Sequence, residues 1–460
     1  MFQSFSSWIS RVCATTNKLV VRNLPQSDRL QKVLAKAIAG TFSIRLLNIG
    51  LAYLVSLLLA RILGADGYGS YIYGLSVVGF LQIPTMLGTN SLVTREVAVY
   101  KTQEQWGLAK GITRWVKLNI IVVSLLTTAI SGVIFWLYQD SFQIDSIYVI
   151  LLGLLVLPIS NLLKISESQL GALGHIVKSQ LPEVIIRPLI MISALVGSYF
   201  FWQDRVGSTA VMGYYLVATT VCLLIISWTI YRLTPIAIAK SKPEYKRRFW
   251  FYEALPMLLI DSMYLINNQT DTLMLGVLTD SASVGIYSIT NRGANLMNFI
   301  LSVFNVSLAP TIASLHAAGE KQKLQQLVKK SANLVFLSSV PIALGLIIFG
   351  SWFLGIFGAE FVKGHTVLTI LCLGKLVNAS TGAVALLLNM TGYQKYTFIG
   401  VAISAVINVF LNALLIPQWG VEGAATATAL STIIWNILLV IFVRQRLGIN
   451  MNPFSKTRAN

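Results

Sequence analysis

Residues 118–138 read LNIIVVSLLTTAISGVIFWLY, a run of 21 residues without a charged side chain. A helix of this length is about 30 Å long, which matches the hydrocarbon core of a bilayer. Similar runs recur from about residue 38 to about residue 443. Of the 460 residues, 55% are hydrophobic and only 11% are charged, against about 25% charged in soluble proteins. The sequence therefore predicts an all-α integral membrane protein.

The apolar runs predict twelve transmembrane helices. Their expected positions are 38–63, 71–88, 116–138, 147–164, 180–201, 209–232, 251–277, 285–313, 333–357, 365–389, 396–416 and 422–443. Residues 1–36 contain no apolar run long enough for a signal peptide, so we expect no cleavage there. Phe5, Trp8, Ile9 and Val12 follow helical spacing, which is compatible with an amphipathic helix at the membrane surface.

The net charge of +18 is explained better by membrane topology than by nucleic-acid binding. Loops that stay in the cytoplasm collect Lys and Arg. Most of the basic residues fall in the loops on one side and at the two ends, whereas the opposite loops hold only Arg61, Arg205 and Lys363. We therefore expect a multi-pass protein of the plasma membrane with both termini in the cytoplasm and no nucleic-acid partner.

The cysteines and histidines indicate neither a cofactor nor a metal. Cys13, Cys222 and Cys372 are scattered, and the three histidines lack the spacing of metal ligands. No nucleotide-binding motif is present either. The sequence therefore predicts no metal site, no cofactor and no catalytic residue.

Two halves of the chain repeat short motifs at one offset. GYGSY (67–71) corresponds to SVGIY (283–287), so that Gly69 matches Gly285 at an offset of 216. Gly174 and Gly392, each just after an apolar run, differ by 218. We expect these glycines to form turns with positive φ. The neighbouring tyrosines would anchor helices at the outer membrane interface; they are Tyr68, Tyr71, Tyr73 and Tyr287.

The repeat predicts twelve helices in two parallel six-helix lobes around a central cleft. Because each half has an even number of spans, both halves enter and leave on the same side. The expected segments are a cytoplasmic N-terminal segment 1–36, an N-terminal lobe 37–235, a basic cytoplasmic linker 236–250, a C-terminal lobe 251–446 and a cytoplasmic tail 447–460.

Polar residues inside apolar spans mark the candidate substrate path, because an ionisable group facing lipid is costly. In LINNQTDTLML (265–275), Asn268 and Asp271 share a helix face with Asp261. We expect this face to border the central cleft, although fraying of the helix end is an alternative. Arg45 and Asn48 form a similar polar stripe on the first span.

Further candidates lie on three other spans. Arg292 and Asn295 belong to the eighth span and Lys375 to the tenth. Arg187 lies in the fifth span, four residues after Glu183, so a self-contained ion pair is the favoured alternative to substrate binding. A cleft with more cations than anions favours an anionic ligand, and guanidinium groups bind phosphate in bidentate fashion.

Arg45 and Asp261 are also separated by 216 residues, so they occupy equivalent positions of the repeat. A pseudo-twofold axis would place them at equal depth on opposite sides of the cleft. One hypothesis is a gating ion pair that forms when the cytoplasmic side closes. The alternative is that each residue faces its own lobe and that the match is a coincidence.

The stretch 389–431, NMTGYQKYTFIGVAISAVINVFLNALLIPQWGVEGAATATALS, resembles the polysaccharide and oligosaccharide flippase family. This Wzx-like family belongs to the superfamily that also contains MATE exporters and lipid II flippases. RILGADGYGSYIYGLS (61–76) and LMLGVLTDSASVGIYS (273–288) are similar to the starts of the family's two halves. The resemblance covers about residues 38–445. It implies that the first, second, seventh and eighth spans line the cavity, whereas Lys375 is a candidate on its own position alone.

The resemblance implies a flippase that moves a polyprenyl-pyrophosphate-linked oligosaccharide from the cytoplasmic to the outer leaflet by alternating access. Its expected partners are that anionic lipid-linked oligosaccharide, membrane lipid, and the polymerase and glycosyltransferases of polysaccharide biosynthesis. A MATE-like exporter and a lipid II flippase remain alternatives, and a membrane polymerase is a weaker one.

Overall fold

A computed structural model describes residues 27–137, 144–202 and 206–449. Within these ranges the chain is helical and contains no strand. The elements are α2 (Ser27–Met86), α3 (Thr89–Thr102), α4 (Trp106–Leu137), α5 (Ile144–Ala172), α6 (Ile176–Leu181), the π-helix η2 (Pro182–Ile186), α7 (Arg187–Trp202), α8 (Ser208–Leu233), α9 (Ile236–Lys240), α10 (Arg247–Leu278), α11 (Ser281–Ala317), α12 (Lys321–Ile348), α13 (Gly350–Phe357), the 3₁₀-helix η3 (Ala359–Gly364), α14 (His365–Thr381), α15 (Val384–Met390) and α16 (Gln394–Leu447).

The length and composition of the helices confirm a multi-pass membrane protein. Among the described residues, eight helices are long and apolar enough to cross a membrane, or up to ten if each of two bent pairs forms one span. Two of the eight are longer than one crossing needs, with 60 residues in α2 and 54 in α16. Each is interrupted by a glycine outside helical geometry, Gly64 with φ 67° and Gly420 with φ 54°.

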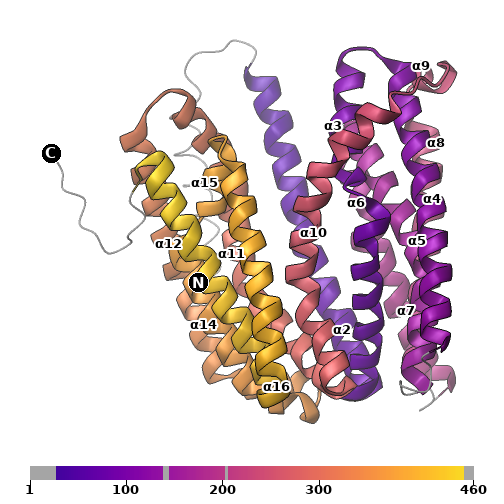
Figure 1. Cartoon of the computed structure of the whole chain (residues 1–460), viewed down its shortest axis with the longest axis vertical. Helices are drawn as coiled ribbons and strands as arrows, with labels where there is room; N and C mark the ends of the chain where they lie inside the picture. Colours follow the sequence, from indigo (N-terminus) through magenta and orange to yellow (C-terminus); the bar gives the residue numbers. More distant parts are fainter. Residues whose placement is uncertain (1–26, 138–143, 203–205, 450–460) are drawn as a thin grey trace.

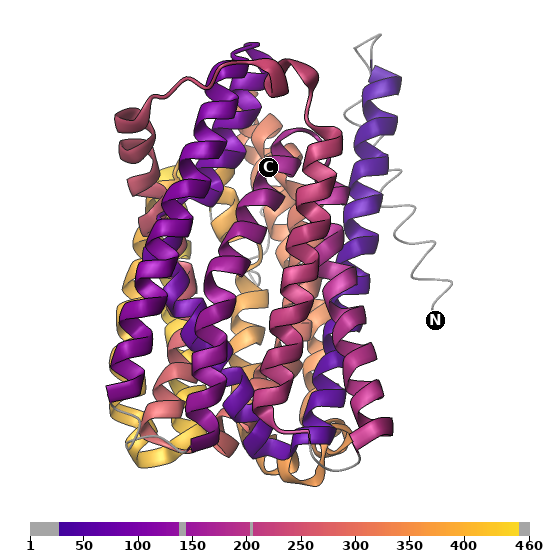
Figure 2. The same cartoon turned by 90° about the vertical axis from the view of Figure 1, so that its right-hand side faces the viewer.

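The long helices run roughly parallel to one another (Figures 1 and 2). Helices α3–α9 lie on one side of the molecule and α11–α16 on the other (Figure 1). Helix α10 and the N-terminal part of α2 stand between the two groups (Figure 1). The predicted N-terminal segment 1–36 and tail 447–460 lie largely outside the described residues.

The repeated glycines have two different roles. Gly174 and Gly392 have φ values of 97° and 82°, which confirms the prediction of positive-φ turns for this pair. The same prediction is wrong for Gly69 and Gly285, which lie within α2 and α11. A Cβ atom on Gly69 would overlap the carbonyl oxygen of Ser281. These two glycines therefore let the backbones of two helices approach each other, as small residues do in membrane proteins.

The tyrosines of the repeat motifs are buried inside the protein, so the prediction of interfacial anchors is wrong. Tyr68, Tyr71 and Tyr287 are exposed by 3% or less. Tyr68 packs edge-on against Phe361 at a centroid distance of 6.2 Å. The close approach of α2 and α11 brings these rings into the core.

The basic linker is held against the N-terminal helices. Lys110 Nζ donates hydrogen bonds to the carbonyl oxygens of Ala239 (2.5 Å) and Ser241 (2.8 Å). The Glu244 amide donates to the Gly107 carbonyl at 3.0 Å. After the linker, Trp250 Nε1 of α10 donates to the hydroxyl of Tyr100 in α3 at 2.9 Å. The start of α10 is thereby fixed to the N-terminal helices.

Candidate functional site

Asp271 is the centre of a buried hydrogen-bond network among α10, α11 and α16. Its side chain is only 3% exposed. One carboxylate oxygen accepts from Asn412 Nδ2 at 2.7 Å and from Asn408 Nδ2 at 3.1 Å. The other accepts from the hydroxyls of Tyr287 and Thr428, each at 2.5 Å. We call these five residues the C-terminal network.

The sequence builds this network from helical spacing. Asn408 and Asn412 lie four residues apart on α16 and therefore share one face of the helix. The break at Gly420 lets the second half of α16 present Thr428 to the same carboxylate. Four neutral donors on two helices thus surround one carboxylate.

Lys375 is a predicted cation on α14, outside this network. Its side chain is half-buried, and Asp271 attracts it electrostatically. Arg292 on α11 is also half-buried, and its backbone carbonyl accepts a hydrogen bond from the hydroxyl of Tyr53 on α2. Asn295 is exposed; its Oδ1 accepts from Asn298 Nδ2 at 2.8 Å. Arg292 and Asn295 thus share α11 with Tyr287 of the C-terminal network, and Lys375 approaches the network from α14.

The remaining predicted residues are not part of this network. Asn48 on α2 is exposed, and the Asn268 side chain on α10 is exposed and donates to the carbonyl of Tyr264 at 2.7 Å. Asp261 is half-buried and accepts from Ser91 Oγ of α3 at 3.5 Å. The side chain of Arg45 lies outside the described residues, so its predicted pairing with Asp261 stays a prediction.

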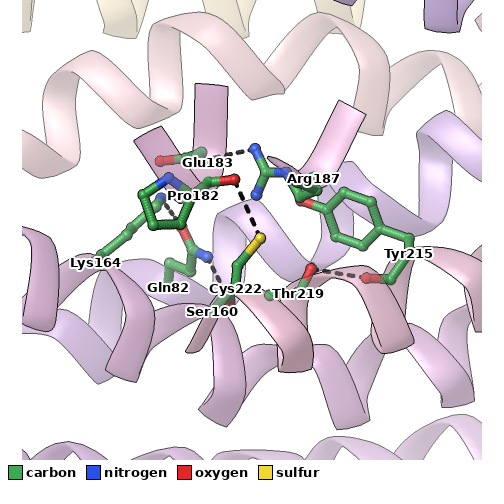
Figure 3. A network of polar contacts seen from close by, with 9 residues as sticks. All are labelled: Gln82, Ser160, Lys164, Pro182, Glu183, Arg187, Tyr215, Thr219 and Cys222. Carbon is green, nitrogen blue, oxygen red and sulfur yellow. Dashed lines mark hydrogen bonds and ion pairs between the residues drawn. The ribbon is translucent and has the colours of Figure 1, made fainter. Parts of the chain in front are cut away.

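A second polar network lies among α2, α5, η2, α7 and α8 (Figure 3). Arg187 forms a salt bridge with Glu183 at 2.7 Å, which confirms the predicted intrahelical pair. The guanidinium lies over the ring of Tyr215 at 5.2 Å from its centroid. Lys164 Nζ donates to Gln82 Oε1 at 2.6 Å. Gln82, Ser160, Lys164, Glu183, Arg187 and Tyr215 make up what we call the N-terminal network.

Sequence reasoning missed several members of both networks. Lys164 stood at the predicted end of the fourth span, but α5 continues to Ala172 and places it inside a helix. Gln82 and Ser160 were unremarkable polar residues near span ends. Asn408 and Asn412 carried a signal, because two amides four residues apart in an apolar span are unusual, yet the sequence did not connect them with Asp271.

Polar contacts also join the two helix groups at the end of the molecule that carries Gly64. The carboxylate of Glu360 in η3 accepts a hydrogen bond from the Ala65 amide at 2.7 Å. Arg61 Nε donates to the carbonyl of Ile356 in α13 at 2.7 Å. The Glu360 anion therefore meets an amide just after the α2 break, and the Arg61 cation meets carbonyls at the C-terminal end of α13. In both cases the helix dipole attracts the charge.

The residues described include no group of three or more His, Cys, Asp or Glu side chains that could hold a metal ion. The fold defines a class, the multi-pass helical membrane proteins. Among solved structures, the chain resembles an inward-facing multidrug resistance MATE family transporter of the MOP superfamily, with a TM-score of 0.71 and 12% identity over 89% of this chain and 96% of that one. It also resembles the inward closed conformation of lipid II flippase MurJ, with a TM-score of 0.66 and 15% identity over 88% of this chain and 87% of that one.

Sequence comparison places the chain within a family. Residues 34–316 match the polysaccharide biosynthesis protein family, and residues 256–414 match the MatE family. Since the first match spans more than half of the chain, the protein belongs to the polysaccharide biosynthesis protein family. A curated relative, the probable low-salt glycan biosynthesis flippase Agl15 of Haloferax volcanii, is 24% identical over 413 residues, or 88% of this chain and 82% of the relative. The protein is a membrane transporter and not a catalytic enzyme.

Proposed function

We propose that the protein is a flippase that moves a polyprenyl-pyrophosphate-linked oligosaccharide from the cytoplasmic to the outer leaflet. The observation that carries this proposal is the similarity over 88% of the chain to a relative named as a glycan biosynthesis flippase. The half-buried cations Arg187, Arg292 and Lys375 are compatible with an anionic headgroup. The protein would lie in the plasma membrane. Glycosyltransferases would supply its substrate there, and a polymerase would use the product.

We further propose twelve crossings in two six-helix lobes, with boundaries near residues 37–235 and 251–446 and with both termini cytoplasmic. The breaks at Gly64 and Gly420 support this count, because each divides a helix that is too long for one crossing. A symmetric contact supports the two lobes. Ala65 and Gly69 of α2 pack against Ser281 and Gly285 of α11, their counterparts at the offset of 216.

Transport by alternating access requires that one side of the cleft closes while the other opens. The contacts of Glu360 with Ala65 and of Arg61 with Ile356 join the two helix groups at one end. By the charge distribution of the loops, this end faces outward. We assign the structure to a state in which the outer side is closed and substrate would enter from the cytoplasm.

The cleft would bind its substrate through residues of both groups. Arg292, Asn295 and Lys375 would hold the pyrophosphate through charge-assisted hydrogen bonds. The exposed amides of Asn48 and Asn268 would contact sugar hydroxyls. Asp271 would hold α10 against α11 and α16, because the donors of its four hydrogen bonds lie on those two helices.

The test is a deletion strain in which lipid-linked oligosaccharide is quantified separately in each leaflet. We expect the intermediate to accumulate in the cytoplasmic leaflet and to return to normal when the wild-type chain is expressed. Normal distribution between the leaflets in the deletion strain would refute the flippase proposal.

A MATE-like exporter is the second candidate, because residues 256–414 match the MatE family and the fold resembles a multidrug transporter. This candidate predicts that the deletion strain becomes sensitive to cationic drugs while its lipid-linked oligosaccharides stay normal. The net positive charge of the chain makes it the weaker candidate for a cationic substrate.

A further inference from the structure

The N-terminal network surrounds a cavity of about 150 Å³. Its polar lining consists of Gln82, Ser160, Lys164, Glu183, Arg187 and Tyr215. Apolar side chains of α2 and α5 complete the wall, and Gly79 of α2 lies next to the side chain of Gln269 from α10. The lining residues all come from helices before the linker, so none of them is among the cleft residues proposed on α10, α11 and α14.

Among the described residues, Lys164 is the cation of this cavity that forms no salt bridge. Its ammonium group is half-buried, and its hydrogen-bond acceptor is the neutral amide oxygen of Gln82. Within the described part of the chain, no carboxylate lies at salt-bridge distance from Lys164. A half-buried cation without a salt bridge is costly, so it marks a position where an anion would bind favourably.

The other charges of the cavity leave the same surplus. Arg187 forms its salt bridge with Glu183 through one nitrogen, which leaves further N–H donors of the guanidinium. Glu183, the partner of Arg187, is the one carboxylate among the lining residues. Two cations and one carboxylate therefore line the cavity.

The donors of the cavity outnumber its acceptors. Lys164 has two N–H donors besides the one given to Gln82. Gln82 Nε2 donates one of its two hydrogens to Ser160 Oγ at 3.1 Å and keeps the other available. A ligand that complements this lining must therefore be rich in acceptors and negatively charged. Carboxylate and phosphate groups have this chemistry, and both fit donors arranged on opposite walls.

We infer that this cavity is a binding subsite for an oxyanion, a carboxylate or phosphate group, that Lys164 and Arg187 hold from α5 and α7. The inference deepens the proposed function and rests on it in one respect, because the translocated glycan is the natural source of the group. An acidic sugar unit would supply a carboxylate, and the lipid carrier or free solution would supply phosphate. The subsite would then favour acidic glycans over neutral ones.

The test uses the purified full-length chain in detergent and measures its thermal unfolding. The probes are sodium glucuronate, inorganic phosphate and glucose, with the ionic strength held constant by sodium chloride. We expect a saturable rise of Tm with glucuronate, phosphate or both, and none with glucose. A response to glucuronate alone assigns the group to an acidic sugar, and a response to phosphate alone assigns it to a phosphate. No response to either anion would overturn the inference.

Two variants locate the response in this cavity. Lys164→Gln should weaken the anion affinity by about tenfold or more, since it removes a charge-assisted hydrogen bond. Gln82→Glu keeps the shape of the side chain and supplies an internal carboxylate to Lys164. This variant should fold at least as stably as wild type and yet lose the response to the anion.

Lys178→Gln is the matched control, because Lys178 is exposed on α6 and does not line the cavity. It should respond to the anion like wild type. An unchanged response in Gln82→Glu, or an equal loss in Lys178→Gln, would overturn the inference. The binding measurement does not depend on export, so a failure of the flippase proposal in the deletion strain would be seen separately.

Discussion

Asp271 shows how one residue can organise a membrane helix bundle. Its carboxylate accepts four hydrogen bonds while its side chain is 3% exposed. A carboxyl group in this setting is tolerated because both of its oxygens accept hydrogen bonds. The same residue would be unfavourable if the helices were packed in another register, so it favours one arrangement of α10, α11 and α16.

The first prediction tests that role. Asp271→Asn removes the charge and places an amide nitrogen against groups that are themselves donors. The loss of a buried, charge-assisted network should lower stability by about 1–3 kcal/mol. A lower Tm of the purified protein would show it, and Asn268→Ala, at an exposed position of the same helix, is the control. Equal unfolding of Asp271→Asn and wild type would contradict this role.

The second prediction concerns Arg292 and Lys375. If these cations hold the pyrophosphate, replacing both by Gln should reduce export by at least about tenfold, because each loses a charge-assisted contact with the substrate. The distribution of lipid-linked oligosaccharide between the leaflets is the measurement, and the amount of variant protein in the membrane is the control. Export at the wild-type rate would exclude both residues from the substrate path.

At the scale of elements, the contact between α2 and α11 depends on the absence of side chains. A Cβ atom on Gly69 would overlap the carbonyl of Ser281, and one on Gly285 would overlap that of Ala65. Backbone cannot move aside as a flexible side chain does, so the two helices must separate to accommodate a methyl group. The contact thus requires glycine at both positions.

The third prediction follows from this contact. Gly69→Ala should destabilise the protein by about 1–3 kcal/mol through overpacking. Gly213→Ala in α8 is the matched control, because a Cβ atom there meets nothing within 4 Å. Alanine is the better helix former, so the control should be neutral or slightly stabilising in thermal unfolding. A similar Tm for both variants would show that the helices do not meet at Gly69.

The fourth prediction tests the closure between η3 and α2. Ala65 is 3% exposed, and its amide donates to Glu360. A cysteine at position 65 should therefore react slowly with a membrane-impermeant thiol reagent from outside. Glu360→Gln should speed this reaction several-fold, because a neutral amide binds the N–H groups after the α2 break less strongly.

Lys363→Gln changes a neighbouring exposed charge of the same helix and should leave the labelling rate of Cys at position 65 unchanged. Labelling that is equally fast with and without the Glu360 change would argue against a closure at this end.

For the whole molecule, the repeat places Arg45 and Asp261 at equivalent positions. Asp261 is half-buried and contacts Ser91 of α3, so it lies where the middle of α10 meets α3. In the state proposed here the outer side is closed. A gating pair on the cytoplasmic side would form in the opposite state.

The fifth prediction is a charge exchange at these positions. Asp261→Ala should impair export by leaving Arg45 without a partner in the other state, because an unpaired buried charge costs several kcal/mol. The double change Arg45→Asp with Asp261→Arg should recover part of that loss. Export no better than in the worse single variant would reject the gate.

The sequence alone determined the class, the family resemblance and one local ion pair. Hydrophobic length predicts a membrane helix because the bilayer fixes how many residues a crossing needs. The pair between Glu183 and Arg187 was predictable because both residues lie on one continuous helical stretch, where a spacing of four brings side chains together. The turns at Gly174 and Gly392 were predictable for the same reason, since a turn depends on its own residues.

Only the tertiary structure decided which helix faces meet. Asp271 accepts a hydrogen bond from Asn412, which lies 141 positions away in the sequence, and Lys164 donates one to Gln82, which lies 82 positions away. Periodicity shows that a helix has a polar face, but the partner of that face depends on how the helices pack. The same limit explains Gly69, which was expected in a turn and instead lies where two backbones meet. A close approach of helices has no signature in the residues of either helix alone, because the overlap exists only between them.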